Sequence, residues 1–344
     1  EFFRWDNTLL DYLVQSPMET GNMSISIITI RTAFKKEDQE TRVSSVFEQF
    51  LNNRAVISTK LGSENLYSTG VLNTGFADGY SGVSQEVIIP AFLAAYTGRS
   101  VTGGSTNLFP AIPLPNWRIT YDGLTKYEKV KKRFKTIAVG HTYRSTFSLS
   151  GFNTNLNFVD LDGDGFSDNI RNVNGDFESK YIIGTVQISE QFSPLISVDM
   201  TWKNSLTTRI EYKKDRTLSM SLANTQLTEV SGREVVVGLG YRLPQVEAKF
   251  MKKFTKKKPP TSDLNLRADV SFRNNQTVIR KAVEGINVLT AGQNIMSIKT
   301  SADYQLSQQL MIRFFFDRVM TNPLISSSFK TANTNSGISL RFTL

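Results

Sequence analysis

The stretch DLDGDGFSDN, residues 160–169, has the residue types and spacing of a calcium-binding loop. Three aspartates occupy alternate positions, and a glycine and a fourth aspartate follow them. This spacing can bring several carboxylates onto one hard cation, and the glycine permits the sharp turn that such loops need. The sequence therefore predicts a structural Ca²⁺ held by carboxylates and one backbone carbonyl, with the ligands Asp160, Asp162, Asp164, Phe166 and Asp168.

The loop does not match an EF-hand. The twelfth position is Arg171, where an EF-hand has a bidentate Glu. The spacing resembles instead the acidic calcium repeats of thrombospondin type 3, in a single copy. The alternative is an acidic, glycine-rich turn without metal, which repulsion among uncompensated carboxylates disfavours.

His141 is the only histidine in the chain. In IAVGHTYRSTFSL it alternates in step with Val139, Tyr143, Phe147 and Leu149, so we expect it on an apolar face. A catalytic imidazole would need a serine or aspartate partner at an accessible rim. No spacing singles out a pair of catalytic carboxylates either, so we expect a structural histidine and no enzymatic activity.

Two basic stretches can be interpreted in more than one way. KKFTKKKPP (252–260) reads as a charged loop between strands, and the alternative is contact with lipid phosphates or an acidic partner. TKYEKVKKRFK (125–135) reads as a solvated helix, with binding to acidic headgroups as the alternative. Basic residues are spread along the chain without a nucleic-acid-binding motif, so we expect no nucleic acid as a partner.

The composition excludes membrane-spanning helices but leaves membrane strands open. The chain has 344 residues, a net charge of +9 and no cysteine. Its mean hydropathy is -0.23, and no run approaches the ~20 consecutive apolar residues of a transmembrane helix. Strands of a membrane barrel alternate apolar and polar residues, so their mean hydropathy is near neutral. The lack of cysteine fits an oxidising compartment without disulfides, although cytosolic proteins can lack it too.

The pattern changes near residue 136. Residues 1–136 mix strands, long loops and short helical insertions. MSISIITIRTAF (23–34) reads as a strand, apolar residues recur at helical spacing over 43–51 and again over 84–96, and prolines impose an extended path on 109–117. Residues 137–344 read as antiparallel strands with a period of two.

The alternation after residue 136 places apolar residues on one face and charged residues on the other. Leu264, Leu266, Ala268, Val270 and Phe272, for example, alternate with polar and charged neighbours. If the second face lines a water-filled lumen, its candidates are Arg209, Glu211, Arg267, Asp269, Lys299, Asp303, Arg313 and Asp317. The segments expected as strands are 137–149, 181–189, 196–202, 206–213, 216–223, 233–243, 264–273, 296–306, 309–319 and 324–330.

A soluble β-sandwich also alternates, but three features favour a membrane barrel. The expected strands are close to the ~9–11 residues that cross a bilayer. Short polar breaks of hairpin length separate many of them, such as NS (204–205), KKDR (213–216) and TNP (321–323). Aromatic residues lie toward the expected strand ends, as in an interfacial girdle: Trp202, Tyr212, Tyr241 and Tyr304.

The last residues, TNSGISLRFTL, alternate up to the terminus. Chain ends usually fray unless another element holds them, and a barrel must seal its last strand against another strand. We therefore expect a closing strand that carries a barrel assembly signal, formed by Asn335, Gly337, Leu340, Phe342 and Leu344.

Several longer stretches resemble one family of membrane proteins. PNWRITYDGL (115–124), SPLISVDMTWKNSLTTRIEYKKDRTLSMSLANTQLTE (193–229), IKTSADYQL, RFFFDRV and TANTNSGISLRFTL are similar to the C-terminal part of the SprA (Sov) family. These are the giant outer-membrane translocons of the type IX secretion system. The similarity extends from about residue 110 to the end.

The resemblance implies a fold, partners and a location. SprA-family proteins are very large single-chain barrels at the bacterial outer membrane. They export folded proteins with C-terminal secretion signals, work with a PorV-type shuttle barrel and a periplasmic plug protein, and serve gliding motility and cell-surface display. This chain is far shorter than such a translocon, so the resemblance implies a C-terminal arc of about a dozen strands. The start EFFRWDN, without initiator Met or signal peptide, fits a mature secreted protein or an internal fragment.

The leading hypothesis is therefore an all-β antiparallel transmembrane arc that lines a wide protein-conducting pore. One alternative is a self-contained porin-like channel, and another is a soluble β-rich surface module that uses the acidic loop for calcium-dependent adhesion. The side on which the loops lie stays open. With Leu344 at the periplasmic rim, counting strands backward puts 252–260 outside and the acidic loop in the periplasm, and one miscounted strand, most readily around 274–293, inverts both.

Overall fold

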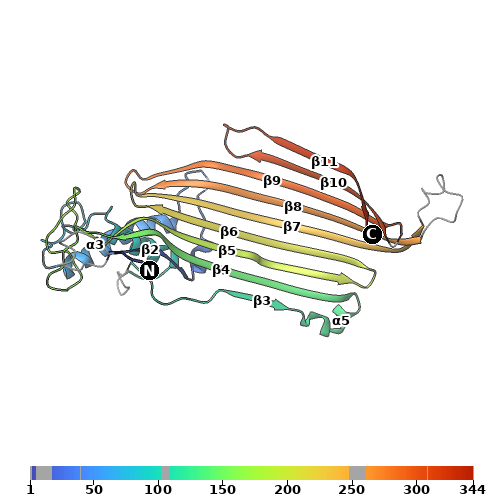
Figure 1. Ribbon diagram of the computed structural model, residues 1–344, viewed down its shortest axis with the longest axis horizontal. Helices are drawn as coiled ribbons and strands as arrows, with labels where there is room; N and C mark the ends of the chain where they lie inside the picture. The colour runs from blue at the N-terminus through green and yellow to red at the C-terminus, as the bar shows by residue number, and fades with distance from the viewer. Residues whose placement is uncertain are drawn as a thin grey trace.

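The protein is all-β, and the part of the chain that the structure describes forms one antiparallel sheet of eleven strands and a few helices. The computed structural model describes residues 2–4, 18–38, 40–101, 108–247, 261–307 and 309–343. Strands are hydrogen-bonded in the order β1-β2-β4-β5-β6-β7-β8-β9-β10-β11, and β3 pairs with β4 (Figure 1). Within the described ranges β11 pairs with β10 only, so the sheet is open at that edge, as in a partial barrel.

The first part of the chain forms mostly short elements, of which α2, α3 and α4 lie around one end of the sheet and α5 lies near the other (Figure 1). α3 carries the expected helical spacing, and Gly98 at φ 67° ends α4 in the left-handed conformation that glycine adopts without strain. The elements are β1 (Phe2–Arg4), β2 (Met18–Ser26), α2 (Ile30–Ala33), α3 (Ser45–Glu64), α4 (Gln85–Thr97), β3 (Trp117–Tyr121), the 3₁₀ turn η1 (Gly123–Lys126) and α5 (Glu128–Lys131).

Long consecutive strands form the rest of the chain. Each is followed by its antiparallel neighbour, and turns of a few residues join most pairs. They are β4 (Phe134–Thr154), β5 (Tyr181–Trp202), β6 (Leu206–Ser221), β7 (Gln226–Glu247), β8 (Thr261–Lys281), β9 (Ile286–Gln305), β10 (Leu310–Pro323) and β11 (Thr331–Phe342).

The expected strand lengths were wrong. Six of these eight strands have 16 to 22 residues, and at ~3.3 Å per residue the longest measure about 70 Å, more than twice the thickness of a bilayer core. In β6 the cause is the KKDR stretch, which lies in the middle of the strand and not at a turn. There Lys213 Nζ lies 3.7 Å from Glu234 Oε2, and Arg216 Nη2 lies 2.9 Å from Glu190 Oε2, so neighbouring strands compensate the charges.

Three further segments differ from the expectation. Residues 23–34 form strand only to Ser26, after which α2 begins at Ile30. Residues 324–330 are the turn between β10 and β11 and not a strand, because Pro323 ends the hydrogen-bonded ladder. The basic run 125–135 contains only η1 and α5, and β4 has begun by Phe134.

The positions of the loops invert the topology obtained by counting strands. β7 ends at Glu247 and β8 begins at Thr261 at the same end of the sheet as the C-terminus, whereas the acidic loop lies at the opposite end with the helices (Figure 1). Residues 248–260, which include the Lys256–Lys258 run, lie outside the described residues. The inversion comes from 324–330, which is counted as a strand and is the turn between β10 and β11. The two segments expected within β5 and the two expected within β6 each form one strand, and these two miscounts cancel.

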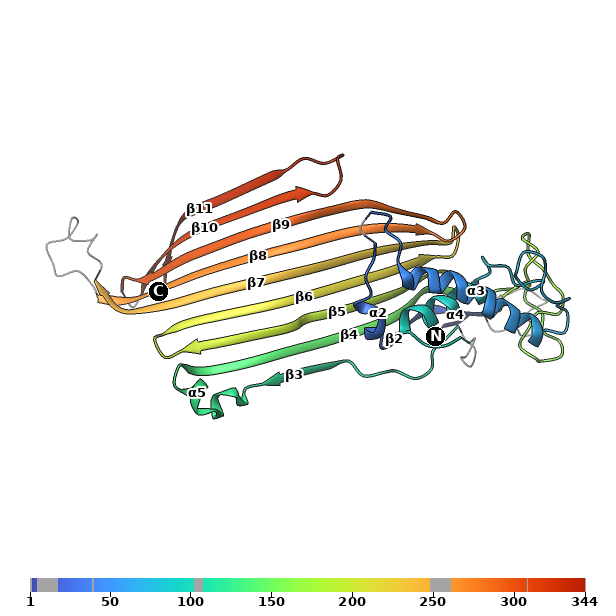
Figure 2. The same cartoon turned by 180° about the vertical axis from the view of Figure 1, so that it is seen from behind.

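α2, α3 and α4 cover one face of the sheet at one end, whereas α5 lies near the opposite end (Figure 2). α3 and α4 pack over the ends of β4, β5 and β6, where the buried residues of both layers form the main hydrophobic cluster. Its members include Phe47, Phe50, Ile88 and Phe92 from the helices and Phe147, Leu149, Val186, Ile188, Leu218 and Met220 from the strands. No helix in the described ranges has the length and apolar character needed to cross a bilayer.

Candidate functional site

The two faces of the sheet differ in chemistry along its whole width. Residues paired across strands point to the same face, and successive residues of a strand point to opposite faces. On one face a continuous register row joins Asp199, Arg209, Gly238, Asp269, Lys299, Asp317 and Asn335, from β5 to β11. We call this face the polar face.

All eight lumen candidates share the polar face. Four of them belong to the row just described, and Glu211, Arg267, Asp303 and Arg313 occupy parallel rows on the same side. Charges of opposite sign alternate along the row, which is the favourable arrangement for cross-strand neighbours. The sequence pattern thus predicted correctly which side chains share a face.

Ion pairs connect the charges of the polar face within and between strands. Arg209 Nη2 lies 3.1 Å from Glu211 Oε2, and Lys213 Nζ lies 3.3 Å from the same oxygen. Arg313 Nη2 donates to Asp303 Oδ2 at 3.1 Å. Because at least one side chain of each pair is open to solvent, each pair contributes only about 0–1 kcal/mol to stability. Their main consequence is a surface on which charges of both signs lie side by side.

The glycines of β7 form a shallow trough on the polar face. Asp215 reaches across Gly232 and Asp269 across Gly238, and in each case a Cβ on the glycine would lie 2.6 Å from the carboxylate oxygen. A hollow of about 380 Å³ opens over this region, lined by Asp199, Arg209 and Arg267 among others. Small side chains on β7 therefore leave space for the charges of the two neighbouring strands.

The opposite face carries an apolar band that no helix covers. Its register rows run from Tyr212, Val235, Phe272 and Met296 at one limit to Leu264, Tyr304, Ile312 and Leu340 at the other. Many of these side chains are exposed, and they include Ile210, Val237, Leu239, Phe272, Phe314, Ile338 and Leu340. Along β8 the band covers residues 264–272, about 26 Å at ~3.3 Å per residue.

A polar row separates this band from the helix-covered end. Lys214, Arg233, Asn274, Asn294 and Asn322 face one another in turn from β6 to β10. We call these five residues the polar row. Tyr212 adjoins it and is therefore in the middle of β6, not at the strand end where we expected it, whereas Trp202 ends β5 and Tyr304 lies one residue before the end of β9.

Beyond the polar row, two buried ionic clusters connect the helical segment to the sheet. In the first, Glu190 accepts from Arg216 Nη2 at 2.9 Å and from Thr29 Oγ1 at 2.5 Å, and the Tyr143 hydroxyl lies 3.2 Å away. In the second, Arg280 Nη2 donates to Glu37 at 2.8 Å and to Glu229 at 3.0 Å. Burial raises the pKa of the Glu37 carboxyl, while the positive charge of Arg280 opposes this rise.

Sequence reasoning missed both clusters. Glu37 and Arg280 are separated by 243 residues, and Glu190 and Thr29 by 161. The one available signal was that Glu190 and Arg280 alternate in step with apolar residues of their strands. A charged side chain on an apolar face needs a partner when it is buried.

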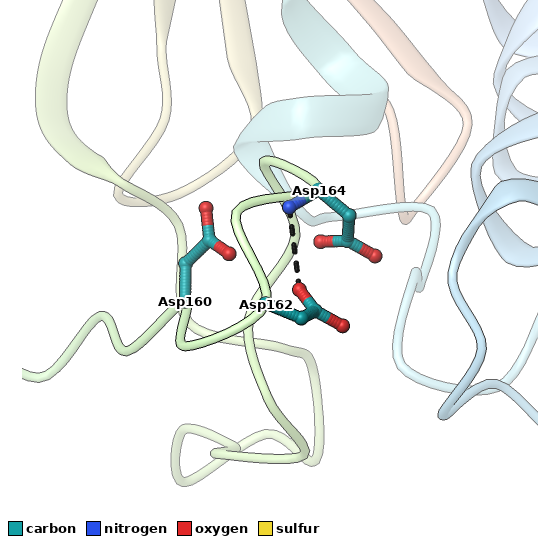
Figure 3. Close-up of side chains that lie close together, drawn as sticks. All are labelled: Asp160, Asp162 and Asp164. Carbon is teal, nitrogen blue, oxygen red and sulfur yellow. Dashed lines mark hydrogen bonds between the residues drawn. The ribbon is translucent and has the colours of Figure 1, made fainter.

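The acidic loop brings together three of its four aspartates (Figure 3). One carboxylate oxygen each of Asp160, Asp162 and Asp164 lies within 4.8 Å of the others. Backbone amides hold these carboxylates in place: Gly163 and Gly165 donate to Asp160, and Asp164 donates to Asp162 at 3.2 Å. This donor set of carboxylate oxygens fits a hard cation such as Ca²⁺.

Of the other two expected ligands, Asp168 lies outside this group, and coordination by the Phe166 backbone carbonyl stays a prediction. Asp168 accepts the Leu161 amide at 2.5 Å and does not belong to the group of three. The Phe166 ring packs against the main hydrophobic cluster. The pKa of Asp162 is raised: the hydrogen bond from the Asp164 amide lowers it, but partial desolvation and repulsion from the neighbouring carboxylates outweigh that effect.

Arg171, which occupies the twelfth position of this loop, has a structural partner. Its guanidinium donates two hydrogen bonds of 2.8 Å to the Asp78 carboxylate and lies 4.3 Å above the Phe177 ring. These hydrogen bonds lower the pKa of Asp78. The pair holds the end of the acidic loop against the segment between α3 and α4.

His141 lies on the apolar face, as its parity predicted. Its Nδ1 is 2.6 Å from the Leu195 carbonyl oxygen, and the rings of Trp117 and Phe192 are 6.4 and 6.3 Å away. A ring nitrogen that donates to a backbone carbonyl and lies among aromatic rings has a structural role.

The residues of the expected assembly signal are divided between the two faces of β11. Leu340 and Phe342 belong to the apolar face and are exposed, whereas Asn335 and Gly337 belong to the polar face opposite Asp317 and Phe315. Leu344 lies outside the described residues. In searches against known proteins, no family model matches the chain and no curated protein does.

Proposed function

We propose that this chain forms an arc of the wall of an outer-membrane channel that conducts folded proteins, as in the translocon of the type IX secretion system. The observation that carries the proposal is the segregation of the two faces. One face carries charges of both signs from β5 to β11, several of them ion-paired, and the other bears an exposed apolar band. A membrane wall between lipid and a water-filled lumen needs this arrangement.

The dimensions of the apolar band support a membrane location. Its length of about 20–26 Å along the strands is close to the ~25 Å apolar belt of outer-membrane barrels. Among the described residues of β5 to β11, the apolar band contains one charged residue, Arg318. It pairs with Ile298, in the second register row of the band counted from the polar row. A long arginine near the edge of a bilayer extends its guanidinium toward the headgroups.

The lumenal role follows from the chemistry of the polar face. Charges of both signs keep this face wetted, so that a passing protein would not adhere to it. The open edge at β11 is consistent with an arc of a larger wall, because an unpaired edge in a membrane needs a further strand. On the resemblance to SprA-family proteins, the partners would be cargo with C-terminal signals, a PorV-type shuttle barrel and a periplasmic plug protein.

Single-cysteine labelling tests the assignment of the two faces. The chain has no native cysteine, and Val270 and Ser271 are adjacent residues on opposite faces in the middle of β8. In isolated outer membranes, a water-soluble maleimide should label Ser271→Cys and leave Val270→Cys unlabelled until detergent is added. Equal labelling of both in membranes would contradict the lipid assignment, and release of the protein by carbonate would favour the soluble adhesion module.

Photo-crosslinking distinguishes a protein conduit from a porin-like channel. A photoreactive residue at Asp269 faces the proposed lumen, and one at Val270 faces the proposed lipid. In secreting cells, Asp269 should give adducts with exported proteins that carry C-terminal signals, and Val270 should not. Absence of such adducts at Asp269, with ion conductance by the isolated closed protein, would favour the porin-like alternative.

A further inference from the structure

A groove of about 730 Å³ lies on the apolar face, where the band meets the polar row. Its floor is apolar and is formed by Val235, Phe272, Met296 and Met320. Its lining spans β6 to β11, so the groove runs across the sheet. The volume falls within the range of small-molecule sites in proteins, about 300–1,000 Å³.

The polar side of this groove is cationic. Arg233 of the polar row and Lys330 of the β10–β11 turn both line it, and no described lining residue is acidic. Both side chains are exposed, and within the described part of the chain neither makes a hydrogen bond or an ion pair. Lys214, opposite Arg233 in register, already donates to the Ala33 carbonyl and lies 4.3 Å above the Phe34 ring.

We infer that this groove binds an anionic phospholipid, with its phosphate between Arg233 and Lys330 and one acyl chain on Phe272 and Met296. Charge complementarity carries this assignment, because a single molecule with an anionic head and an apolar tail matches both halves of the groove. The inference rests on the proposed function, since membrane embedding brings lipid to this face.

The test titrates the purified full chain in detergent with dioctanoyl phosphatidylglycerol and counts bound lipid by native mass spectrometry. Replacement of both cations, Arg233→Gln with Lys330→Gln, should weaken binding about tenfold or more. The matched control is Arg118→Gln with Arg341→Gln, which makes the same charge change at exposed sites on the polar face and should leave binding unchanged.

A second variant tests the acyl-chain half of the groove. Phe272 is exposed, so Phe272→Thr removes the apolar floor without opening the protein core. Phe272→Thr should reduce the affinity for the dioctanoyl lipid. Free glycerol phosphate, which has the anionic head without acyl chains, should compete weakly with the lipid, and to the same extent in this variant as in the unmodified protein. If inorganic phosphate competed for the groove as strongly as unlabelled lipid does, the ligand would be a free anion, and the inference would be overturned.

The remaining outcomes are also decisive. Equal binding of dioctanoyl phosphatidylcholine, insensitive to the loss of Arg233 and Lys330, would indicate a general apolar surface and overturn the inference, as would no binding to the unmodified protein. Because the titration is done in detergent, its failure is separate from failure of the proposed function. If the protein stays in membranes after carbonate extraction but binds no phosphatidylglycerol, only the inference about the groove fails, and the proposed function stands.

Discussion

The apolar face of the sheet has two halves that the same strands form in two different ways. At one end, α3 and α4 cover Phe147, Leu149 and Leu218, which are fully buried. At the other end, the same face of the sheet carries Ile210 of β6, Val237 of β7 and Phe272 of β8, and no element in the described part of the chain covers them. β6 crosses both halves without a bulge in its pairing to β7.

This difference teaches that strand sequence alone does not determine what buries an apolar face. In the covered half the chain supplies its own core, with ionic clusters and helices fitted to the strands. In the bare half, something other than the described part of the chain must bury the apolar side chains. The polar row lies at the boundary between the half that the helices cover and the bare half. Comparison of matched substitutions in the two halves shows whether a bilayer buries the bare half.

The largest expected effect is loss of a core ring in the covered half. Phe147→Ala should lower the free energy of unfolding by about 3–5 kcal/mol, because it leaves a cavity between helices and sheet. Phe272→Ala in the bare half should cost only about 1–2 kcal/mol, since fluid lipid or detergent fills the vacated space. Denaturant unfolding in detergent measures both, and equal losses would show that protein covers the band.

The sequence predicted the faces but not the boundary between the halves. The period of two at Leu264, Leu266 and Val270 is sufficient to assign sides, because parity needs no tertiary information. Strand length was lost at Lys213–Arg216, where four charged residues look like a turn and are in fact compensated across strands by Glu234 and Glu190.

The helical cover could be predicted as separate helices but not as a layer on the sheet. Helical spacing identified 43–51 and 84–96, yet nothing local shows that these helices pack on β4 to β6. In the acidic loop, alternation placed Asp160, Asp162 and Asp164 together, whereas the direction of Asp168 depends on its bond to the Leu161 amide. Such long-range and loop-specific contacts have no periodic signature.

The next largest effect comes from a charge placed on the bare half. Leu239→Arg lies in the third of the five band rows, one row farther from the polar row than Arg318, and should destabilise the protein in lipid vesicles by about 2–4 kcal/mol. Val236→Arg points to the polar face opposite Glu211 and should change stability by no more than about 0.5 kcal/mol. Reversible unfolding from vesicles measures the pair, and equal costs would contradict the two-face assignment.

A smaller effect should be confined to the covered half and depends on pH. Burial raises the pKa of Glu86, in the first turn of α4, to about 7; a hydrogen bond with Ser179 lowers it, and the negative charge of Asp176 raises it further. A carboxyl whose pKa is higher in the folded state favours folding at low pH. That contribution is lost as the pH rises from its unfolded value, 4.5, through about 7.

The free energy of unfolding should therefore fall by up to about 3 kcal/mol over this window, at about 1.4 kcal/mol per pKa unit, and Glu86→Gln should flatten the profile. Hydrogen exchange would locate the change: amides of α4 should lose protection on raising the pH, while those of β8 in the bare band should not. An unchanged slope in the Gln variant would exclude Glu86 as the titrating group.

The smallest effect concerns the acidic loop, which also belongs to the covered end. If the loop holds a structural Ca²⁺, its affinity should be in the range of extracellular sites, with a Kd of about 10⁻⁴–10⁻³ M, since only three carboxylates converge and all are largely open to water. Tenfold excess of Ca²⁺ over Kd would then stabilise the loop by about 1.4 kcal/mol.

Calorimetry should detect this binding in the unmodified protein and not in Asp162→Asn with Asp164→Asn. The control pair Asp122→Asn with Glu128→Gln removes the same charge at the opposite end of the sheet and should leave the titration unchanged. Equal heats from all three proteins would mean that the loop is an acidic turn held by its own backbone hydrogen bonds, and that Asp160, Asp162 and Asp164 tolerate one another through solvent screening alone.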